Sequence, residues 1–312
     1  MEMTNFDPGL TQKFGAGLTR AINKDGTFNV HRTGTGWRDI HPYLHLINMP
    51  WPLFVAVVVI GYGVVNLLFA SAYYGLGPGQ LAGVEGGSEA DRFLSAFYFS
   101  AQTLTTVGYG GLSPKGTAAN MLAVFEAMLG WLSLAVATGL LYGRVSRPSA
   151  RLGFSGRMVV APFQSGSSVQ FRIVNQRANT LMDVEAMVLL MTVQGAPGAL
   201  RREYDLLKLE RRRIFFFPLT WTIVHPIDNE SPFLGKTPAD LERLQAEVLI
   251  LVKAFDDTFS QTVHARYSYR YDEIVWDGRF KPAFEIGESG DMILHVDRVG
   301  DYAAAGSEGT SA

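Results

Sequence analysis

Two long uncharged stretches interrupt the mixed pattern of hydrophobic and polar residues along the chain. Residues 50–84 contain no charged residue, and residues 117–143 contain only one, Glu126. A bilayer core about 30 Å thick requires roughly 20 apolar residues of helix. We therefore predict membrane-spanning helices over residues 51–74 and 120–143. The first of these is too long for the apolar region of a signal peptide.

The basic residues that flank the two spans predict their orientation. Five lysines and arginines lie in residues 1–50 and four in residues 144–157, whereas the segment between the spans has only Arg92 and Lys115. Because cytoplasmic flanks are enriched in lysine and arginine, we expect both termini to be cytoplasmic. Residues 37–49 mix aromatic, aliphatic and charged side chains, which favours a short interfacial helix. A plain linker is the alternative.

The segment that joins the spans predicts a re-entrant pore loop. A glycine-rich loop is followed by a helical pattern over residues 91–104, which is too short to cross the bilayer, and then by Thr-Thr-Val-Gly-Tyr-Gly at 105–110. Non-helical backbone at membrane depth is tolerated only where it is buried in protein or lines a cavity. Gly108 and Gly110 can take positive φ, so successive carbonyl groups can point to one side.

Such a row of carbonyl oxygens can replace the water shell of a potassium ion. The C-terminal end of the short helix carries a partial negative charge, which favours a cation beside it. One strand cannot surround an ion, so several copies around an axis are required, and a filter of this kind implies four. The predicted potassium ligands are Thr106, Val107, Gly108 and Tyr109, with Gly110 completing the filter.

Several residues of the second span are candidates for gating. Leu134 and Tyr142 are eight residues apart, and facing a pore they would form hydrophobic rings that gate by dewetting. A lipid-facing position is the alternative. Gly130 and Gly139 mark points where the helix can bend or admit a neighbour. Glu126 is costly at membrane depth, and we expect it to hydrogen-bond behind the filter, with a pore-facing position as the alternative.

After residue 147 the hydrophobic pattern changes to a period of two, which indicates strands. Many short strands at regular spacing favour a β-sandwich. A short helix should start at Thr237-Pro238, and the small polar end, 300–312, should be disordered. The predicted strands cover residues 157–161, 169–174, 184–193, 204–209, 214–224, 247–255, 263–271, 280–285 and 292–298.

Composition narrows the function classes further. The chain of 312 residues is 47% hydrophobic and 18% charged, has no cysteine and carries a net charge of −2. These values argue against a disordered chain, a disulfide-stapled secreted protein and a nucleic-acid partner. No phosphate-binding loop, zinc-protease, nucleophile-elbow or dinucleotide-binding motif is present, so we expect no enzyme activity. The arginines at 201–202 and 211–213 are expected to be solvated charges, with phosphate or lipid binding as the alternative.

The motifs of the whole chain resemble those of the inward-rectifier potassium channels, especially the prokaryotic branch. The similarity lies in residues 105–110, 221–228, Ser231-Pro232, 265–269 and 272–276. The resemblance implies a homotetramer whose immunoglobulin-like cytoplasmic domains continue the ion path. The expected fold class is thus an α + β membrane protein, in which two transmembrane helices with a re-entrant pore helix and filter precede a cytoplasmic immunoglobulin-like β-sandwich.

The resemblance also implies roles for single residues. Leu134 lies where eukaryotic members often have an acidic residue that binds polyamines or magnesium, which argues against strong rectification. Gly139 and Tyr142 match the helix-bundle gate, and Gln102 and Leu112 replace a glutamate and an arginine that brace the filter. Basic positions near anionic phospholipids, phosphoinositides among them, correspond to Arg38, Arg144 and Arg147. The cytoplasmic mouth loop comprises Ser260, Gln261, Thr262, Val263 and His264.

Together these patterns predict a potassium-selective tetrameric channel in the inner membrane of a bacterium, modulated by anionic lipid and using no cofactor besides the permeant ion. A weakly selective cation pore and a non-conducting, membrane-anchored binding module are the alternatives. The expected parts are a cytoplasmic segment (1–36), an interfacial helix (37–49), a pore domain (50–147), the sandwich (148–299) and the tail (300–312).

Overall fold

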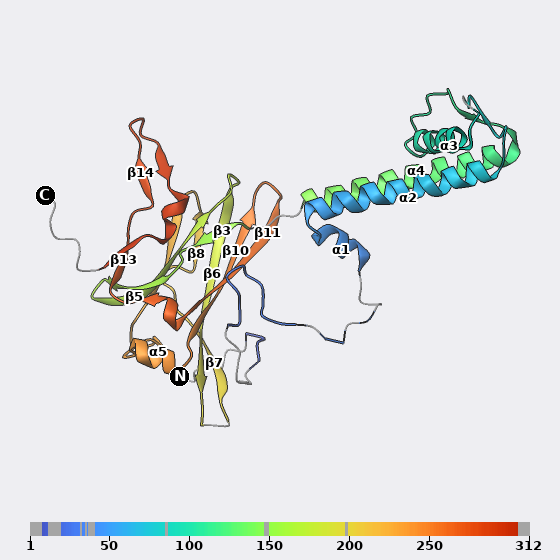
Figure 1. The fold of residues 1–312 in the computed structure, drawn as a ribbon. Helices are drawn as coiled ribbons and strands as arrows, with labels where there is room; N and C mark the ends of the chain where they lie inside the picture. The colour runs from blue at the N-terminus through green and yellow to red at the C-terminus, as the bar shows by residue number, and fades with distance from the viewer. Residues whose placement is uncertain are drawn as a thin grey trace. The chain divides into compact units, whose positions relative to one another are not determined.

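The computed structural model describes residues 8–11, 20–31, 33, 34, 36, 41–84, 87–146, 150–196 and 199–304. The chain divides into two compact units, one that combines Met1–Arg32 with Pro148–Ala312 and one that comprises Thr33–Arg147 (Figure 1). Arg38, Arg147, the first residues of the predicted interfacial helix and residues 305–312 lie outside the described residues.

The unit Thr33–Arg147 is helical. Its two long helices, α2 and α4, have 25 and 30 residues and are apolar enough to cross a membrane. Both predicted spans are confirmed as helices, although α4 begins four residues earlier than predicted, in a polar first turn. The short helix α1 begins at Pro42, whose fixed φ and missing N–H suit the first helical position. The helices are α1 Pro42–Asn48, α2 Trp51–Gly75, α3 Glu89–Leu104 and α4 Gly116–Val145.

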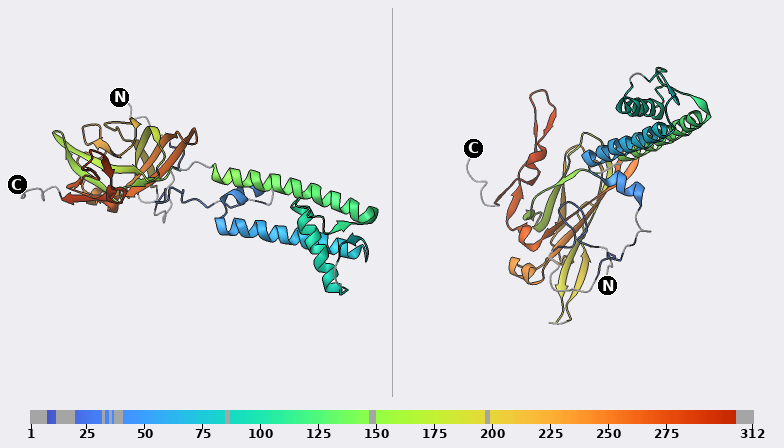
Figure 2. Two further views of the ribbon diagram at one scale, coloured as in Figure 1. Left: turned by 90° about the horizontal axis from the view of Figure 1, so that it is seen from above. Right: turned by 45° about the vertical axis from the view of Figure 1, so that its right-hand side comes forward.

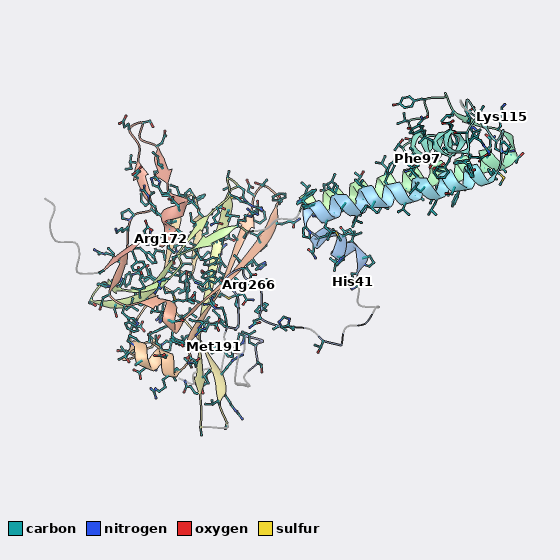
Figure 3. All side chains as sticks on the ribbon, viewed as in Figure 1. His41, Phe97, Lys115, Arg172, Met191 and Arg266 are labelled. Carbon is teal, nitrogen blue, oxygen red and sulfur yellow. The ribbon has the colours of Figure 1, made fainter. Side chains whose placement is uncertain are left out.

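Helix α3 packs against α2 and α4 at the end of the unit away from α1 (Figure 1). Ser88 caps it in a capping box with Asp91, so α3 starts two residues before the predicted 91–104. The Phe99 ring lies edge-on to Tyr73 of α2 at 5.0 Å. Strands β1 Leu81–Ala82 and β2 Ser113–Pro114, which precede and follow α3 in the sequence, pair with each other. Figure 3 labels Phe97 of α3 and Lys115, which follows β2, at the same end of this unit.

The other unit contains two five-stranded sheets with a shared core, as predicted (Figures 1 and 2). One sheet has the order β11-β10-β6-β7, with β8 also paired to β6. The other has the order β12-β4-β5-β3, with β9 paired to β5. The strands are β3 Leu152–Phe154, β4 Met158–Phe163, β5 Gly166–Asn175, β6 Leu181–Gln194, β7 Arg201–Leu206, β8 Arg213–Phe216, β9 Thr220–Pro226, β10 Glu247–Asp256, β11 Gln261–Arg270 and β12 Ile274–Val275.

Alternate residues of the longer strands contribute to the core. In β10, for example, Val248, Ile250 and Val252 are buried in it. The helix predicted after Thr237 is confirmed as α5 Pro238–Arg243, with the threonine side chain accepting from the Asp240 N–H. Two further strand pairs follow the sandwich: β13 Gly278–Phe280 pairs with β16 Tyr302–Ala304, and β14 Phe284–Ile286 pairs with β15 Met292–Leu294. One 3₁₀ turn, Tyr271–Glu273, lies between β11 and β12, and another, Val296–Gly300, follows β15.

Four predictions about the strands are wrong. The predicted strand 292–298 ends at Leu294, and residues 296–298 lie in a 3₁₀ turn instead. The predicted strand 214–224 is two strands in different sheets, and the predicted strand 280–285 is also two, β13 and β14. A proline lies in each interruption, at 218 and 282, and proline cannot donate to a strand ladder. Residues 302–304, predicted to be disordered, form β16, because pairing with β13 supplies the order that their small side chains do not signal.

Residues 20–30 pack against the sandwich. The backbone N–H groups of Ala21 and Ile22 donate to the buried carboxylate of Glu247 at 2.9–3.4 Å. The Ser268 hydroxyl donates to the Ile22 carbonyl at 2.7 Å, and Lys24 forms an ion pair with Glu273 at 2.6 Å. Segments more than 200 residues apart in sequence are therefore joined within one unit.

Two buried basic side chains also tie strands of the sandwich to neighbouring segments. The Arg172 guanidinium donates to the Lys281 carbonyl at 2.7 Å, and burial lowers the pKa of Arg172 (Figure 3). His225 lies between the Lys208 carbonyl, 2.8 Å from Nδ1, and the Ser231 hydroxyl, 2.7 Å from Nε2. Nδ1 must carry the proton because a carbonyl can only accept. Burial lowers the pKa of His225.

Candidate functional site

The predicted filter continues directly from the end of α3. The N–H groups of Val107 and Gly108 both donate to the Gln102 carbonyl, at 2.9 and 3.2 Å, and the Thr106 N–H donates to the Thr103 carbonyl at 3.0 Å. These amides therefore face the helix. The carbonyl oxygens of residues 106–109 accept no hydrogen bond from the part of the chain that the structure describes. They remain available to another partner.

The backbone of this segment alternates in handedness. Thr106, Gly108 and Gly110 have φ of 62°, 52° and 83°, whereas Val107 and Tyr109 do not have positive φ. Carbonyl groups of a regular strand alternate in direction, so reversing every second residue brings successive carbonyls to one side. A β-branched residue at positive φ is a genuine outlier that costs about 1–3 kcal/mol. The three hydrogen bonds to the end of α3 hold Thr106 in this conformation.

A single subunit leaves the filter uncovered. In one chain the residue Val107 is 52% exposed and the residue Tyr109 is 81% exposed. Side chains of this kind require cover from other copies or from neighbouring molecules at membrane depth. The geometry therefore suits a strand that contributes one wall of a pore rather than a closed site.

Glu126 is buried behind α3 instead of on the open face of α4. Its carboxyl oxygens lie 2.7 Å from the Tyr73 hydroxyl of α2 and 2.5 Å from the Ser100 hydroxyl of α3. Leu134 and Tyr142 are exposed, by 62% and 73%. Each step of eight residues advances about 80° beyond two full turns, so Glu126 lies about 80° from Leu134 and about 160° from Tyr142, whereas Leu134 and Tyr142 lie within about 80° of each other.

Gly130 and Gly139 differ in what surrounds them. A Cβ atom on Gly130 would lie 2.1 Å from the carbonyl oxygen of Leu104, the last residue of α3. Gly139 has nothing within 4 Å of the corresponding position. Gly130 therefore admits the end of the pore helix, whereas Gly139 lies on an open face with Leu134 and Tyr142.

Arg144, a predicted lipid contact, is engaged within its own unit. Its guanidinium donates to the carbonyls of Leu46, Ile47 and Met49 at 2.5–3.0 Å. It also lies over the rings of Trp51 and Phe54, 4.7 and 4.4 Å from their centroids. These contacts join the C-terminal end of α1 and the start of α2 to the last turn of α4.

The predicted cytoplasmic mouth loop is mostly strand. Ser260 lies in the turn with φ of 50°, but Gln261, Thr262, Val263 and His264 open β11 and pair with β10. Val263 and His264 fall within the predicted strand 263–271, and Gln261 and Thr262 extend that strand toward the turn. The place of these residues at a cytoplasmic mouth stays a prediction. The arginines at 211–213 pair with Glu210, Glu185 and Asp183, which fits solvated charges. The same prediction is wrong for Arg202, which is buried in β7, because its side chain points to the covered face of the strand whereas that of Arg201 is exposed.

The sequence interpretation missed the partners of Glu126. Asn66, Tyr73 and Ser100 are fully buried around it, and only the carboxylate was singled out. A signal was present, since Asn66 is an amide in the middle of an apolar span. Among the described residues no cluster of three or more histidine, aspartate or glutamate side chains could hold a metal ion.

Two family models match the chain. Residues 152–303 match "Inward rectifier potassium channel C-terminal domain", and residues 53–146 match "Ion channel". The chain is 37% identical to "Inward rectifier potassium channel Kirbac3.1" of Paramagnetospirillum magnetotacticum, over 91% of this chain and 96% of that protein. It is 27% identical to "G protein-activated inward rectifier potassium channel 3" of Homo sapiens, over 85% and 72% of the two chains, and 26% identical to channel 2 of that name from Mesocricetus auratus, over 86% and 68%.

Proposed function

The chain belongs to the inward-rectifier potassium channel family and is an integral membrane protein, and from this we propose that it forms a homotetrameric, potassium-selective pore. Four copies of residues 106–109 would surround the ion with carbonyl oxygens. The observation that carries the proposal is the alternation of φ at Thr106, Gly108 and Gly110, which leaves a row of carbonyls without a partner in the described chain. A helix that only anchors the chain in the membrane does not require a backbone strained in this way.

We further propose where the pore closes. Leu134, Gly139 and Tyr142 share the open surface of α4, and large hydrophobic side chains there form a constriction when four copies meet. A second narrowing lies at Ser260, Gln261, Thr262, Val263 and His264, in the β10–β11 hairpin. Glu126 supports the filter from behind, through α3.

Anionic phospholipid, including phosphoinositide, is the proposed modulator. Arg38 and Arg147 are its proposed direct contacts, in a bacterial inner membrane with both termini cytoplasmic. Arg144 contributes in another way, because its donors hold the carbonyl end of α1. Its role is to couple α1 to α4, so that a displacement of α1 by bound lipid also displaces α4.

Reconstitution in a planar bilayer with opposed potassium and sodium gradients tests the function. We expect the reversal potential to follow the potassium gradient. A reversal potential midway between the two gradients would favour a weakly selective pore, and absence of current would favour a non-conducting binding module.

Two alanine variants test the filter itself. Gly108→Ala forces an L-residue to positive φ, at about 1–2 kcal/mol in each subunit, although the space for a methyl group is open. Gly111→Ala is the matched control, because Gly111 has equal space and no positive φ. Loss of selective current in the first variant alone is the expected result.

A further inference from the structure

Four polar side chains meet where α2, α3 and α4 pack together. They are Asn66 and Tyr73 from α2, Ser100 from α3 and Glu126 from α4, and each is at most 1% exposed. This burial is complete within one subunit and does not depend on assembly. Every donor and acceptor in the group must therefore find its partner inside the group or on the adjacent backbone.

The distances define a chain of contacts through the three helices. The Tyr73 hydroxyl donates to Oε2 of Glu126 at 2.7 Å. The Ser100 hydroxyl oxygen lies 2.5 Å from Oε1 of Glu126 and 3.1 Å from Oδ1 of Asn66. The Asn66 amide nitrogen donates to the Tyr62 carbonyl at 2.7 Å.

An ionised Glu126 leaves this chain one proton short. A carboxylate only accepts, so the single Ser100 proton would go to Glu126. Oδ1 of Asn66 would then face the Ser100 oxygen with no proton between them. Turning the amide around does not help, because Oδ1 would then lie against the Tyr62 carbonyl, which is another acceptor.

We propose that Glu126 is a neutral carboxylic acid whose Oε1 carries the proton and donates it to Ser100. Ser100 then donates to Asn66, Asn66 donates to the Tyr62 carbonyl, and Tyr73 donates to Oε2. Each of these polar atoms has a partner of the opposite kind. Glu126 thus acts as the first hydrogen-bond donor of a chain from α4 through α3 to α2.

The surroundings of Glu126 support the neutral form. No lysine, arginine or histidine in the described part of the chain forms an ion pair with it, and an unpaired charge at membrane depth is costly. Among the residues that the structure describes, Tyr73 is the only other titratable group that is hydrogen-bonded to Glu126. A neutral acid keeps the geometry without that cost.

This inference rests on the proposed filter, for which Glu126 is a positioning residue. Ser100 lies two residues before Gln102, whose carbonyl receives the N–H groups of Val107 and Gly108. A proton on Glu126 therefore fixes, through Ser100, the turn of α3 whose Gln102 carbonyl accepts the hydrogen bonds of the filter backbone. Losing the donor frees that turn of α3 from α4.

Infrared spectroscopy of the full chain in lipid bilayers tests the proton directly. We expect a carbonyl band of a protonated carboxylic acid that shifts in heavy water and is missing from Glu126→Gln. If that variant does not assemble, Ser100→Ala should move the band to the frequency of a more weakly bonded acid. A wild-type spectrum without the band, with a carboxylate signal in the difference from Glu126→Gln, would overturn the inference.

Selectivity provides the second readout. Glu126→Gln keeps a donor for Ser100 and an acceptor for Tyr73, so its selectivity should match the wild type. Glu126→Met keeps the size but removes both, and we expect the potassium-to-sodium permeability ratio to fall about 5- to 150-fold. Equal ratios in the two variants would refute the positioning role. The infrared band reports the proton on Glu126 without any current, so it tests this inference even if the chain proves not to conduct.

Discussion

Replacing Gly130 of α4 by alanine should disturb the filter by pushing on the C-terminal end of α3. The new Cβ would lie 2.1 Å from the carbonyl oxygen and 2.9 Å from the carbonyl carbon of Leu104. Ordinary contacts between such atoms are about 3.5 Å or longer, so the two backbones must separate by more than about 1 Å. Leu104 directly precedes residues 105–110, and the displacement therefore passes to the carbonyl row.

The free energy has two opposing parts. Alanine in a helix interior is more favourable than glycine by about 0.8–1.0 kcal/mol. Overpacking a site closed by backbone costs about 1–3 kcal/mol, occasionally more, because neither helix can relax by a side-chain rotation. The net result is a destabilisation of up to about 2 kcal/mol in each of four subunits. Gly61→Ala is the matched control, since Gly61 is also inside a helix but has nothing within 4 Å.

Thermal dissociation of the detergent-solubilised tetramer and the reversal potential measure the two consequences. We expect Gly130→Ala to lower the midpoint and to move the reversal potential away from the potassium value, while Gly61→Ala keeps or raises the midpoint. If Gly130→Ala is as stable and as selective as Gly61→Ala, the close approach of α3 to α4 does not support the filter.

Three further predictions concern the other contacts. Glu247→Gln removes an acceptor for the N-terminal segment and should cost about 1–3 kcal/mol, seen as faster hydrogen exchange at residues 20–30; unchanged exchange would contradict it. Burial holds the pKa of His225 below its unfolded value of about 6.5, so its contribution to stability is present above that pH and lost as pH falls below it. The unfolding midpoint should fall on acidification more steeply than in His225→Gln, and parallel curves would disprove this. Arg144→Lys keeps the charge but loses the forked guanidinium donors that bind the carbonyl groups at the end of α1. We expect faster hydrogen exchange at residues 42–49, and exchange equal to that of the wild type would show that these hydrogen bonds do not hold α1.

The lengths of the apolar runs predicted the two spans because hydrocarbon thickness sets a helix length that any window of sequence can be tested against. The segment 105–110 was equally readable, since only glycine takes positive φ without cost and two glycines occupy alternate positions. Thr106 was not foreseen at positive φ. Hydrogen bonds to the end of α3 decide its conformation, and no local pattern reports them.

Periodicity identified most strands of the sandwich but not which sheet each one joins. Residues 214–224 were predicted as one strand, yet β8 and β9 pair in different sheets, because partners far along the chain determine the pairing. The place of Glu126 was open for the same reason. Its helix phase is a property of the sequence, but only the approach of α2 and α3 shows which face of α4 is covered and which is left for a pore.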